Sequence, residues 1–242
     1  MLSIPLLIIP ILLALNSIFL TDPYATPNQS LLYWVGIAIF MNSMMYVVPI
    51  IFSYVSGQNL SEEIENRFFG VISQRCNKIT VYKAKMFATI IIAIRLFLIE
   101  LMGCIVIYYL TYFLGGVDLT GKIFGQGYNI EAVSFIVEMF IFYCILIPVT
   151  ISGISTYITD KNKLIISFVI IIFVGRIIPS NNIFNHIIPW NILREFSQIE
   201  TGAGGNNLAH SLFSIGNALV IALVIGLTSY FLGRNKIRRI NL

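Results

Sequence analysis

Six long apolar runs, separated by short polar connections, limit the fold of this chain more than any other feature of its sequence. A helix needs about 20 mainly apolar residues to cross a bilayer, because the hydrocarbon offers backbone polar groups no water. We therefore expect one all-α, polytopic membrane domain over residues 1–242, with six transmembrane helices. The six runs are residues 2–20, 32–55, 86–114, 132–157, 164–178 and 212–232, of which the fifth is the shortest.

Composition supports the membrane class and excludes several others. The chain is 57% hydrophobic and only 11% charged, with a mean hydropathy of +0.88, which leaves too little polar surface for a water-soluble globule. Cys76, Cys104 and Cys144 follow no metal-ligand spacing, so we expect neither zinc nor a disulfide framework. The net charge of +4 comes from basic residues beside apolar runs, as membrane topology requires, and does not indicate nucleic-acid binding.

The basic residues also predict how the chain is oriented in the cell membrane. Lys and Arg concentrate in the cytoplasmic connections of membrane proteins. Eleven of the 15 basic residues fall on one side of the predicted bundle, so we expect that side, with both termini, to be cytoplasmic. These eleven are Arg67, Arg75, Lys78, Lys83, Lys85, Lys161, Lys163, Arg234, Lys236, Arg238 and Arg239.

The connection between the second and third runs is unusually polar. Residues 61–85 hold 8 of the chain's 26 charged residues, yet apolar side chains recur among them at helical spacing. This pattern predicts an amphipathic helix over residues 62–74, with Ser61 as its N-cap and Glu62 and Glu63 in its first turn. Two interpretations remain open: a surface helix whose charges are solvated or meet anionic membrane lipid, or a docking element for a partner.

The order of features in this connection is an acid-rich start, an apolar pair, a basic and polar turn, and then a Tyr and Lys leading into the next run. The residues are Glu63, Glu65, Val71, Ile72, Gln74, Arg75, Cys76, Asn77, Lys78, Tyr82, Lys83 and Lys85. This order resembles the cytoplasmic loop between the second and third spans of ABC-2 type transporter permeases. The six spans, cytoplasmic termini and a long outer connection before the last span extend the resemblance along the chain.

The chain also departs from that family at several points. Asn66 and Arg67 stand where the family often has Gly-Thr, and Cys76 lies near the position of a Pro. We expect no cytoplasmic helix of the kind that often precedes the first span in that family, because the first apolar run begins almost at Met1.

The resemblance implies that the polar connection is a coupling helix, which docks in a groove of a separate ATPase subunit. ATP and Mg²⁺ would then be held by that partner, and this chain would bind no cofactor and be no enzyme. A second permease, identical or not, would complete the transporter. The residues implied to couple to the ATPase are Glu63, Glu65, Arg67, Phe68, Phe69 and Ile72.

Among such permeases, the chain looks like the small ones of low-GC Gram-positive bacteria, of the phenol-soluble modulin exporter or lantibiotic immunity type. That resemblance implies export of amphipathic or antimicrobial peptides, which can enter from the surrounding lipid. Drug or polysaccharide export is an alternative. The resemblance also implies short extracellular helices in residues 179–210, where Trp190 is expected at the headgroup level.

Three charged residues inside the apolar runs are candidates for a translocation pathway. Glu100 lies near the middle of the third run, where an acid must face the bundle interior or be protonated. Arg95 is five residues away, about 140° around a helix, so the two do not share a face. Glu138 lies in the fourth run towards the outer side. Helix-helix contact or interface anchoring is the competing explanation for all three.

Two catalytic motifs are only partly present. Residues 62–67 read EEIENR and fit the EExxxR signature of CAAX-protease-like intramembrane hydrolases, but His186 and His210 both lack the Phe of the companion FxxxH motif. The hydrolase is therefore kept as the alternative function. Residues 116–123 read GVDLTGKI, which resembles a phosphate-binding loop but has Ile123 where a magnesium-binding hydroxyl is required. We expect this segment to be an outer turn.

Overall fold

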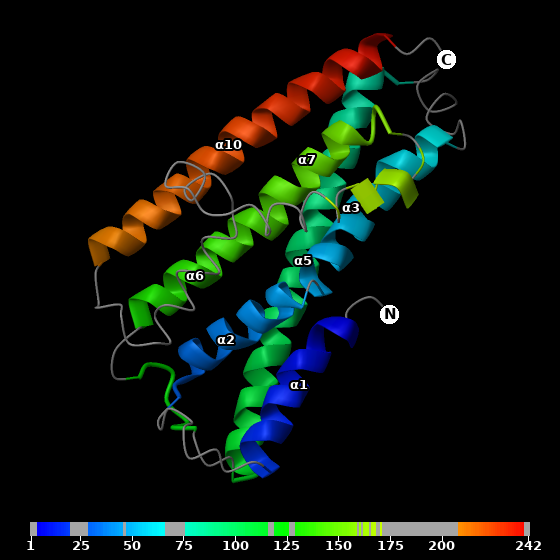
Figure 1. Ribbon diagram of the computed structural model, residues 1–242. Coiled ribbons are helices and arrows are strands. Elements are labelled where there is room, and N and C mark those ends of the chain that lie inside the picture. The colour runs from blue at the N-terminus through cyan, green and yellow to red at the C-terminus, as the bar shows by residue number, and fades with distance from the viewer. Residues whose placement is uncertain are drawn as a thin grey trace. The chain divides into compact units, whose positions relative to one another are not determined.

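The computed structural model is all-helical and describes residues 4–19, 29–45, 47–65, 76–115, 119–125, 129–158, 160, 162–164, 166–167, 170 and 208–239 (Figure 1). Its helices are α1 (Ile4–Phe19), α2 (Leu31–Met44), α3 (Val47–Glu65), α5 (Lys78–Phe113), α6 (Asn129–Ile141), the π-helical turn η1 (Phe142–Leu146), α7 (Ile147–Ile154) and α10 (Leu208–Arg239). The all-α prediction is confirmed for these ranges.

Within these ranges, three helical segments are long and apolar enough to cross a membrane: Lys78–Phe113, Asn129–Ile154 and Ser211–Arg239. Helices α2 and α3 make a fourth if they are counted as one broken span, whereas α1 has 16 residues and is about 24 Å long. Only 28% of the apolar stretch of α5 and 22% of that of α10 is buried, so the outer faces of both helices suit contact with lipid. The chain therefore has transmembrane helical character, and the six-span count stays a prediction because most of the fifth run lies outside the described residues.

The second predicted span is interrupted where the sequence had indicated one helix. Helix α2 ends at Met44 and α3 begins at Val47. Pro49 explains the break, because a proline has no N–H for the carbonyl four residues earlier and its ring collides with that carbonyl, here that of Met45. As the third residue of α3, Pro49 occupies a position whose N–H needs no partner within the helix. The sequence predicted a span over residues 32–55 without this break, and a span made of the two helices stays a prediction.

A second proline changes the helix type in the fourth predicted span. Pro148 follows the π-helical turn η1, which joins α6 to α7 without ending the helix. A π-helical turn shifts the hydrogen-bond register by one residue, which lets a helix continue past a missing N–H. Residues Asn129–Ile154 therefore remain one span with a local widening.

Helix α3 corrects the predicted start of the amphipathic helix. It runs without a break from Val47 to Glu65, so Ser61 lies inside a helix and is not an N-cap. No proline follows Pro49 in this stretch, and the polar residues from Gln58 onward are compatible with a helix that leaves the apolar layer. Residues 66–75 lie outside the described residues, and with them most of the expected coupling helix.

The chain divides into two compact units, each with its own core. Unit 1 comprises Met1–Val48, Leu96–Met139 and Asn191–Gly216, and unit 2 comprises Pro49–Arg95, Phe140–Trp190 and Asn217–Leu242. In unit 1, α2 is apolar on all sides and ten of its 14 residues are buried, which is the pattern of a central helix. In unit 2, aromatic pairs connect the helices, with ring centroids 5.3 Å apart for Phe52 and Tyr143 and 5.9 Å apart for Tyr82 and Tyr230.

The segment 119–125 caps the N-terminal end of α2. The backbone N–H groups of Leu31 and Leu32 donate to the carbonyls of Lys122 and Ile123 at 2.9 and 3.3 Å. These N–H groups have no partner within their own helix, so the segment supplies the missing acceptors. The resemblance of residues 116–123 to a phosphate loop is thus not matched by the fold, because helix α5 and no strand precedes them.

Gly121 adopts a left-handed conformation in this capping segment, with φ of 68°, and a Cβ there would lie 2.6 Å from the Tyr112 ring. We expect Gly121→Ala to lower the free energy of unfolding by about 1–2 kcal/mol from the backbone alone, plus the cost of moving that ring. Gly115→Ala is the matched control, because φ is 88° but nothing lies within 4 Å of the added Cβ. Unfolding in detergent should show a larger loss for Gly121→Ala, and equal losses would contradict this account.

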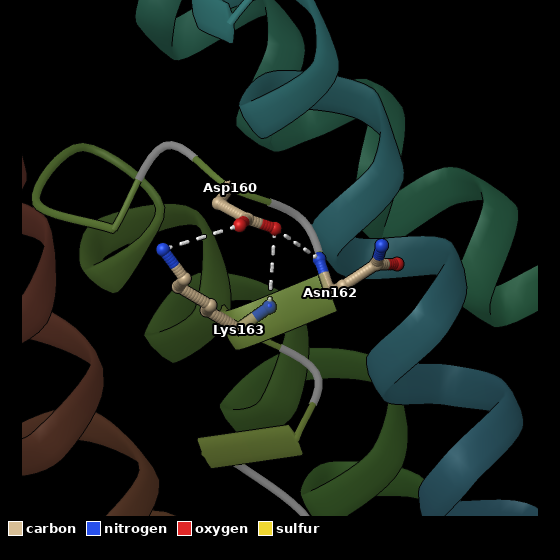
Figure 2. A network of polar contacts seen from close by, with 3 residues as sticks. All are labelled: Asp160, Asn162 and Lys163. Atoms are coloured by element: carbon tan, nitrogen blue, oxygen red, sulfur yellow. Dashed lines mark hydrogen bonds and ion pairs between the residues drawn. The ribbon is translucent and has the colours of Figure 1, made fainter.

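Asp160 caps a helical turn between the fourth and fifth predicted runs. Figure 2 shows its carboxylate facing the backbone N–H groups of Asn162 and Lys163, which donate to Oδ1 at 2.9 and 3.2 Å. The Lys163 ammonium lies 3.5 Å from Oδ2. The N–H of Lys163, followed by that of Asn162 and the ammonium charge, holds the pKa of Asp160 below its usual value.

This lowered pKa predicts how the turn responds to acid. A group whose pKa is lower in the folded state stabilises that state above its unfolded pKa, and the effect is lost as the pH falls through the folded pKa. Amide exchange at Asn162 and Lys163, corrected for the intrinsic rate at each pH, should therefore show protection that is constant near neutrality and lost in acid. Asp160→Asn keeps the acceptor oxygen without the charge and should remove this pH dependence. An unchanged pH profile in that variant would contradict the capping role.

Candidate functional site

A buried polar contact joins three helices of unit 1. The side-chain Nδ2 of Asn42 in α2 donates to the backbone carbonyl of Leu6 in α1 at 2.9 Å and to Oε1 of Glu100 in α5 at 2.8 Å. All three residues have no measurable exposure. The two donor hydrogens of one amide thus satisfy acceptors on two different helices.

Pro10 explains why the Leu6 carbonyl needs a donor from outside its helix. In α1, the N–H four residues after Leu6 would normally donate to this carbonyl, but that position is Pro10. A buried carbonyl without a donor is costly, and more so where no water is present. The Asn42 amide supplies the missing donor, so a proline in one helix sets the requirement for an amide in another.

Glu100 belongs to a buried stripe along one face of α5. Phe97, Glu100, Cys104, Tyr108 and Thr111 are spaced by three or four residues, and each is at most 2% exposed. Next to this stripe, a Cβ on Gly103 would overlap the Leu7 side chain of α1, so the two helices approach closely there. This face of α5 is therefore the packing surface for α1 and α2.

A second polar face lies on α6 in the same unit. Glu131, Ser134 and Glu138 are spaced three and four residues apart, so they share one face of the helix, and all three are buried. The Ser134 hydroxyl lies 3.0 Å from Oε1 of Glu138 and 3.2 Å from the Ser211 carbonyl of α10, so it can donate to either. Both carboxyl oxygens of Glu131 lack a hydrogen-bond partner among the described residues.

The two polar sites differ in what they can bind. At Glu100, Oε1 accepts from Asn42 while Oε2 has no partner among the described residues. The α6 face presents acceptor oxygens and one hydroxyl, so it suits a ligand that brings ammonium or amide donors. Among the described residues, no cluster of three His, Cys, Asp or Glu side chains is placed to hold a metal ion.

The structure describes all three residues predicted for the translocation pathway. Glu100 and Glu138 are buried at 0% and 2% exposure, each next to a polar neighbour. Arg95 is exposed on α5, which confirms that it and Glu100 do not share a face. The pathway role itself is not tested by these positions.

The coupling residues are only partly within the described structure. Glu63 and Glu65 belong to the last turn of α3, although their side chains are not described. Arg67, Phe68, Phe69 and Ile72 lie outside the described residues. His186 also lies outside them, whereas Cys104 and Cys144 are buried and form no disulfide.

Four polar residues at these sites were not singled out from the sequence: Asn42, Glu131, Ser134 and Ser211. The spacing of Glu131, Ser134 and Glu138 on one helical face was a readable signal. An amide in an otherwise apolar run marked Asn42 as unusual. Its partners, however, are 36 and 58 residues away, and no local pattern identifies them.

Comparison with known proteins assigns no family to the chain: no family model, curated protein or solved structure matches it.

Proposed function

We propose that this chain is the membrane-spanning permease subunit of an ATP-binding cassette exporter of the ABC-2 type. A separate ATPase subunit would bind ATP and Mg²⁺, and this chain would convert its movement into rocking of the membrane helices. The connection after α3 would be the docking element, with Glu63, Glu65, Arg67, Phe68, Phe69 and Ile72 as its contact residues.

One observation supports this role most directly. Ile64, in the last turn of α3, packs against an apolar cluster of Val81 and Tyr82 at the start of α5 and Ile237 at the end of α10. The polar connection thus leaves from a point where three long helices are packed together. A rigid-body force applied to the connection would reach α5 and α10 at once, as mechanical coupling requires.

The acceptor-rich face of α6 supports peptides as the exported substrate. Buried carboxyl groups inside a membrane protein require donors, and the oxygens of Glu131 have none among the described residues. An amphipathic or cationic peptide brings ammonium and amide donors together with apolar side chains. We propose that such peptides pass along this face, beside Glu138, in a dimer with a second permease.

Co-purification tests the proposal. The unchanged protein should co-purify with a polypeptide that mass spectrometry identifies as an ABC ATPase and that hydrolyses ATP. Glu65→Lys and Phe68→Asp should each abolish that association or uncouple hydrolysis from transport while leaving the protein in the membrane. Asp118→Lys is the control for Glu65→Lys, because both replace an acid by a lysine. The pattern of basic residues predicts that Asp118 lies in a connection on the opposite side of the membrane. Retained coupled transport in both test variants would refute the docking role.

A further inference from the structure

A groove opens in unit 2 between α5, the η1–α7 region and α10, with a volume of about 350 Å³. That volume is within the range of ligand sites in proteins. Its walls are almost entirely apolar, and Met86 and Phe87 of α5, Val149 of α7, and Ala222, Gly226 and Leu227 of α10 contribute to them.

The groove runs along the face of a membrane helix. On α10 its lining residues extend from Ala222 to Tyr230, a rise of about 12 Å, which is close to the roughly 15 Å of hydrocarbon in one leaflet. Phe87, Leu223 and Leu227 on its walls are 58%, 58% and 52% exposed, so its rim is open to the surroundings. An extended apolar chain fits these dimensions.

One end of the groove carries positive charge. Lys83 lines this end from α5, and Tyr230 lines it from α10. Arg234 follows one turn after Tyr230, and its Nε is shielded from solvent without an acceptor among the described residues. Lys83 has no carboxylate partner in the described part of the chain either. Figure 1 shows this end of α10 beside the start of α5. The Tyr82 ring of α5 and the Tyr230 ring of α10 stack here, with centroids 5.9 Å apart.

From these features we infer that the groove binds a phospholipid with an anionic headgroup. One acyl chain lies against Val149 and Gly226, and the headgroup phosphate accepts hydrogen bonds from Lys83 and Arg234. An apolar cleft with basic donors at one end matches the two chemical parts of such a lipid. The site is independent of transport and does not rest on the proposed exporter function.

Gly226 provides the means to test the acyl-chain contact. A Cβ there would meet Val149 Cγ1 at 3.6 Å, an ordinary contact, so a side chain at this position points into the groove and does not break the packing. Gly226→Leu should fill the groove. Gly216→Leu is the matched control on the same helix, because nothing lies within 4 Å of its added Cβ.

Native mass spectrometry after detergent delipidation measures the bound lipid, with phosphatidylglycerol and phosphatidylcholine offered as probes. The unchanged protein should retain phosphatidylglycerol in preference to phosphatidylcholine. Gly226→Leu should lose both, and Lys83→Gln should reduce phosphatidylglycerol retention about fivefold, since a basic residue contributes about 1 kcal/mol to an anionic lipid contact. Gly216→Leu and the surface control Lys122→Gln should behave like the unchanged protein.

Two results would overturn the proposal. Equal retention of phosphatidylglycerol by Gly226→Leu and the unchanged protein would show that lipid does not occupy the groove. A peptide or a second copy of the chain would then be the remaining occupants to test. Equal retention of the two lipids by the unchanged protein would show that the basic end does not recognise a headgroup. Lys83→Gln alters an exposed side chain, so it tests the site even if Gly226→Leu fails to fold.

Discussion

Replacing Asn42 by Leu should lower the free energy of unfolding by about 2 kcal/mol, because it removes the donors of two buried acceptors at once. The Leu6 carbonyl and Oε1 of Glu100 both lose their hydrogen bonds to the amide, which measure 2.9 and 2.8 Å. Leucine is similar in size, so a packing defect adds little. The measurement is reversible unfolding of the purified protein in mixed detergent micelles.

A second substitution separates the two halves of this loss. Pro10→Ala supplies an N–H that can donate to the Leu6 carbonyl within α1. In the Pro10→Ala background, Asn42→Leu should therefore cost about 1 kcal/mol less than it does alone. Strict additivity of the two substitutions would refute the assignment of Asn42 as the substitute donor.

Glu100 is the second acceptor of the Asn42 amide, and its substitution tests the other hydrogen bond. Glu100→Gln keeps a carbonyl oxygen to accept from Asn42, so it should be milder than Glu100→Leu, which leaves an amide hydrogen of Asn42 unpaired. Full stability and full activity in both variants would show that Glu100 is not a site residue.

Gly153→Ala should be the most damaging single-methyl change in unit 2. A Cβ on Gly153 of α7 would overlap the Ser229 carbonyl oxygen of α10 and lie 2.8 Å from its carbon. These are backbone atoms, which cannot rotate away as the end of a side chain can. The helices must separate, and we expect a loss of about 2–3 kcal/mol, as for overpacked cores.

Gly216→Ala gives the matched comparison, because it adds the same methyl group to a helix with nothing within 4 Å. Alanine is favoured over glycine in a helix by about 1 kcal/mol, so this change should stabilise the protein. The two substitutions are thus expected to have opposite signs in the same unfolding experiment. A stabilising or neutral Gly153→Ala would show that α7 and α10 do not approach as closely as the structure has them.

The close approach of α7 and α10 also explains where small residues are needed in this chain. A Cβ on Gly233 would lie 3.0 Å from the Gly153 Cα and 2.5 Å from the Tyr82 hydroxyl. Glycines at both positions let the backbones meet, as is common where membrane helices cross. Gly226, seven residues before Gly233 in α10, has more space around it. Gly226 borders the groove, whereas Gly233 lies where two helices pack against each other.

Sequence patterns predicted the helical class and the apolar segments well, because both depend on local composition. The runs 86–114, 132–157 and 212–232 correspond to α5, to α6 through α7, and to α10. The spacing of five residues predicted that Arg95 and Glu100 lie on different faces of the helix, and the structure has Glu100 on a buried face and Arg95 on an exposed one. Local patterns did not indicate the break between α2 and α3, and the prediction of Ser61 as an N-cap was wrong, because Ser61 lies inside α3.

The sequence by itself determined that this chain forms apolar helices, because helix length and hydropathy are properties of consecutive residues. It also required some donor for the carbonyl that Pro10 leaves unpaired in α1. Only the tertiary structure decided that Asn42 is that donor, that Glu100 shares its amide, and that Gly153 meets the Ser229 backbone. The physical reason is distance along the chain: these contacts join residues 36 to 76 positions apart, and only the packing of helices against one another brings such residues together.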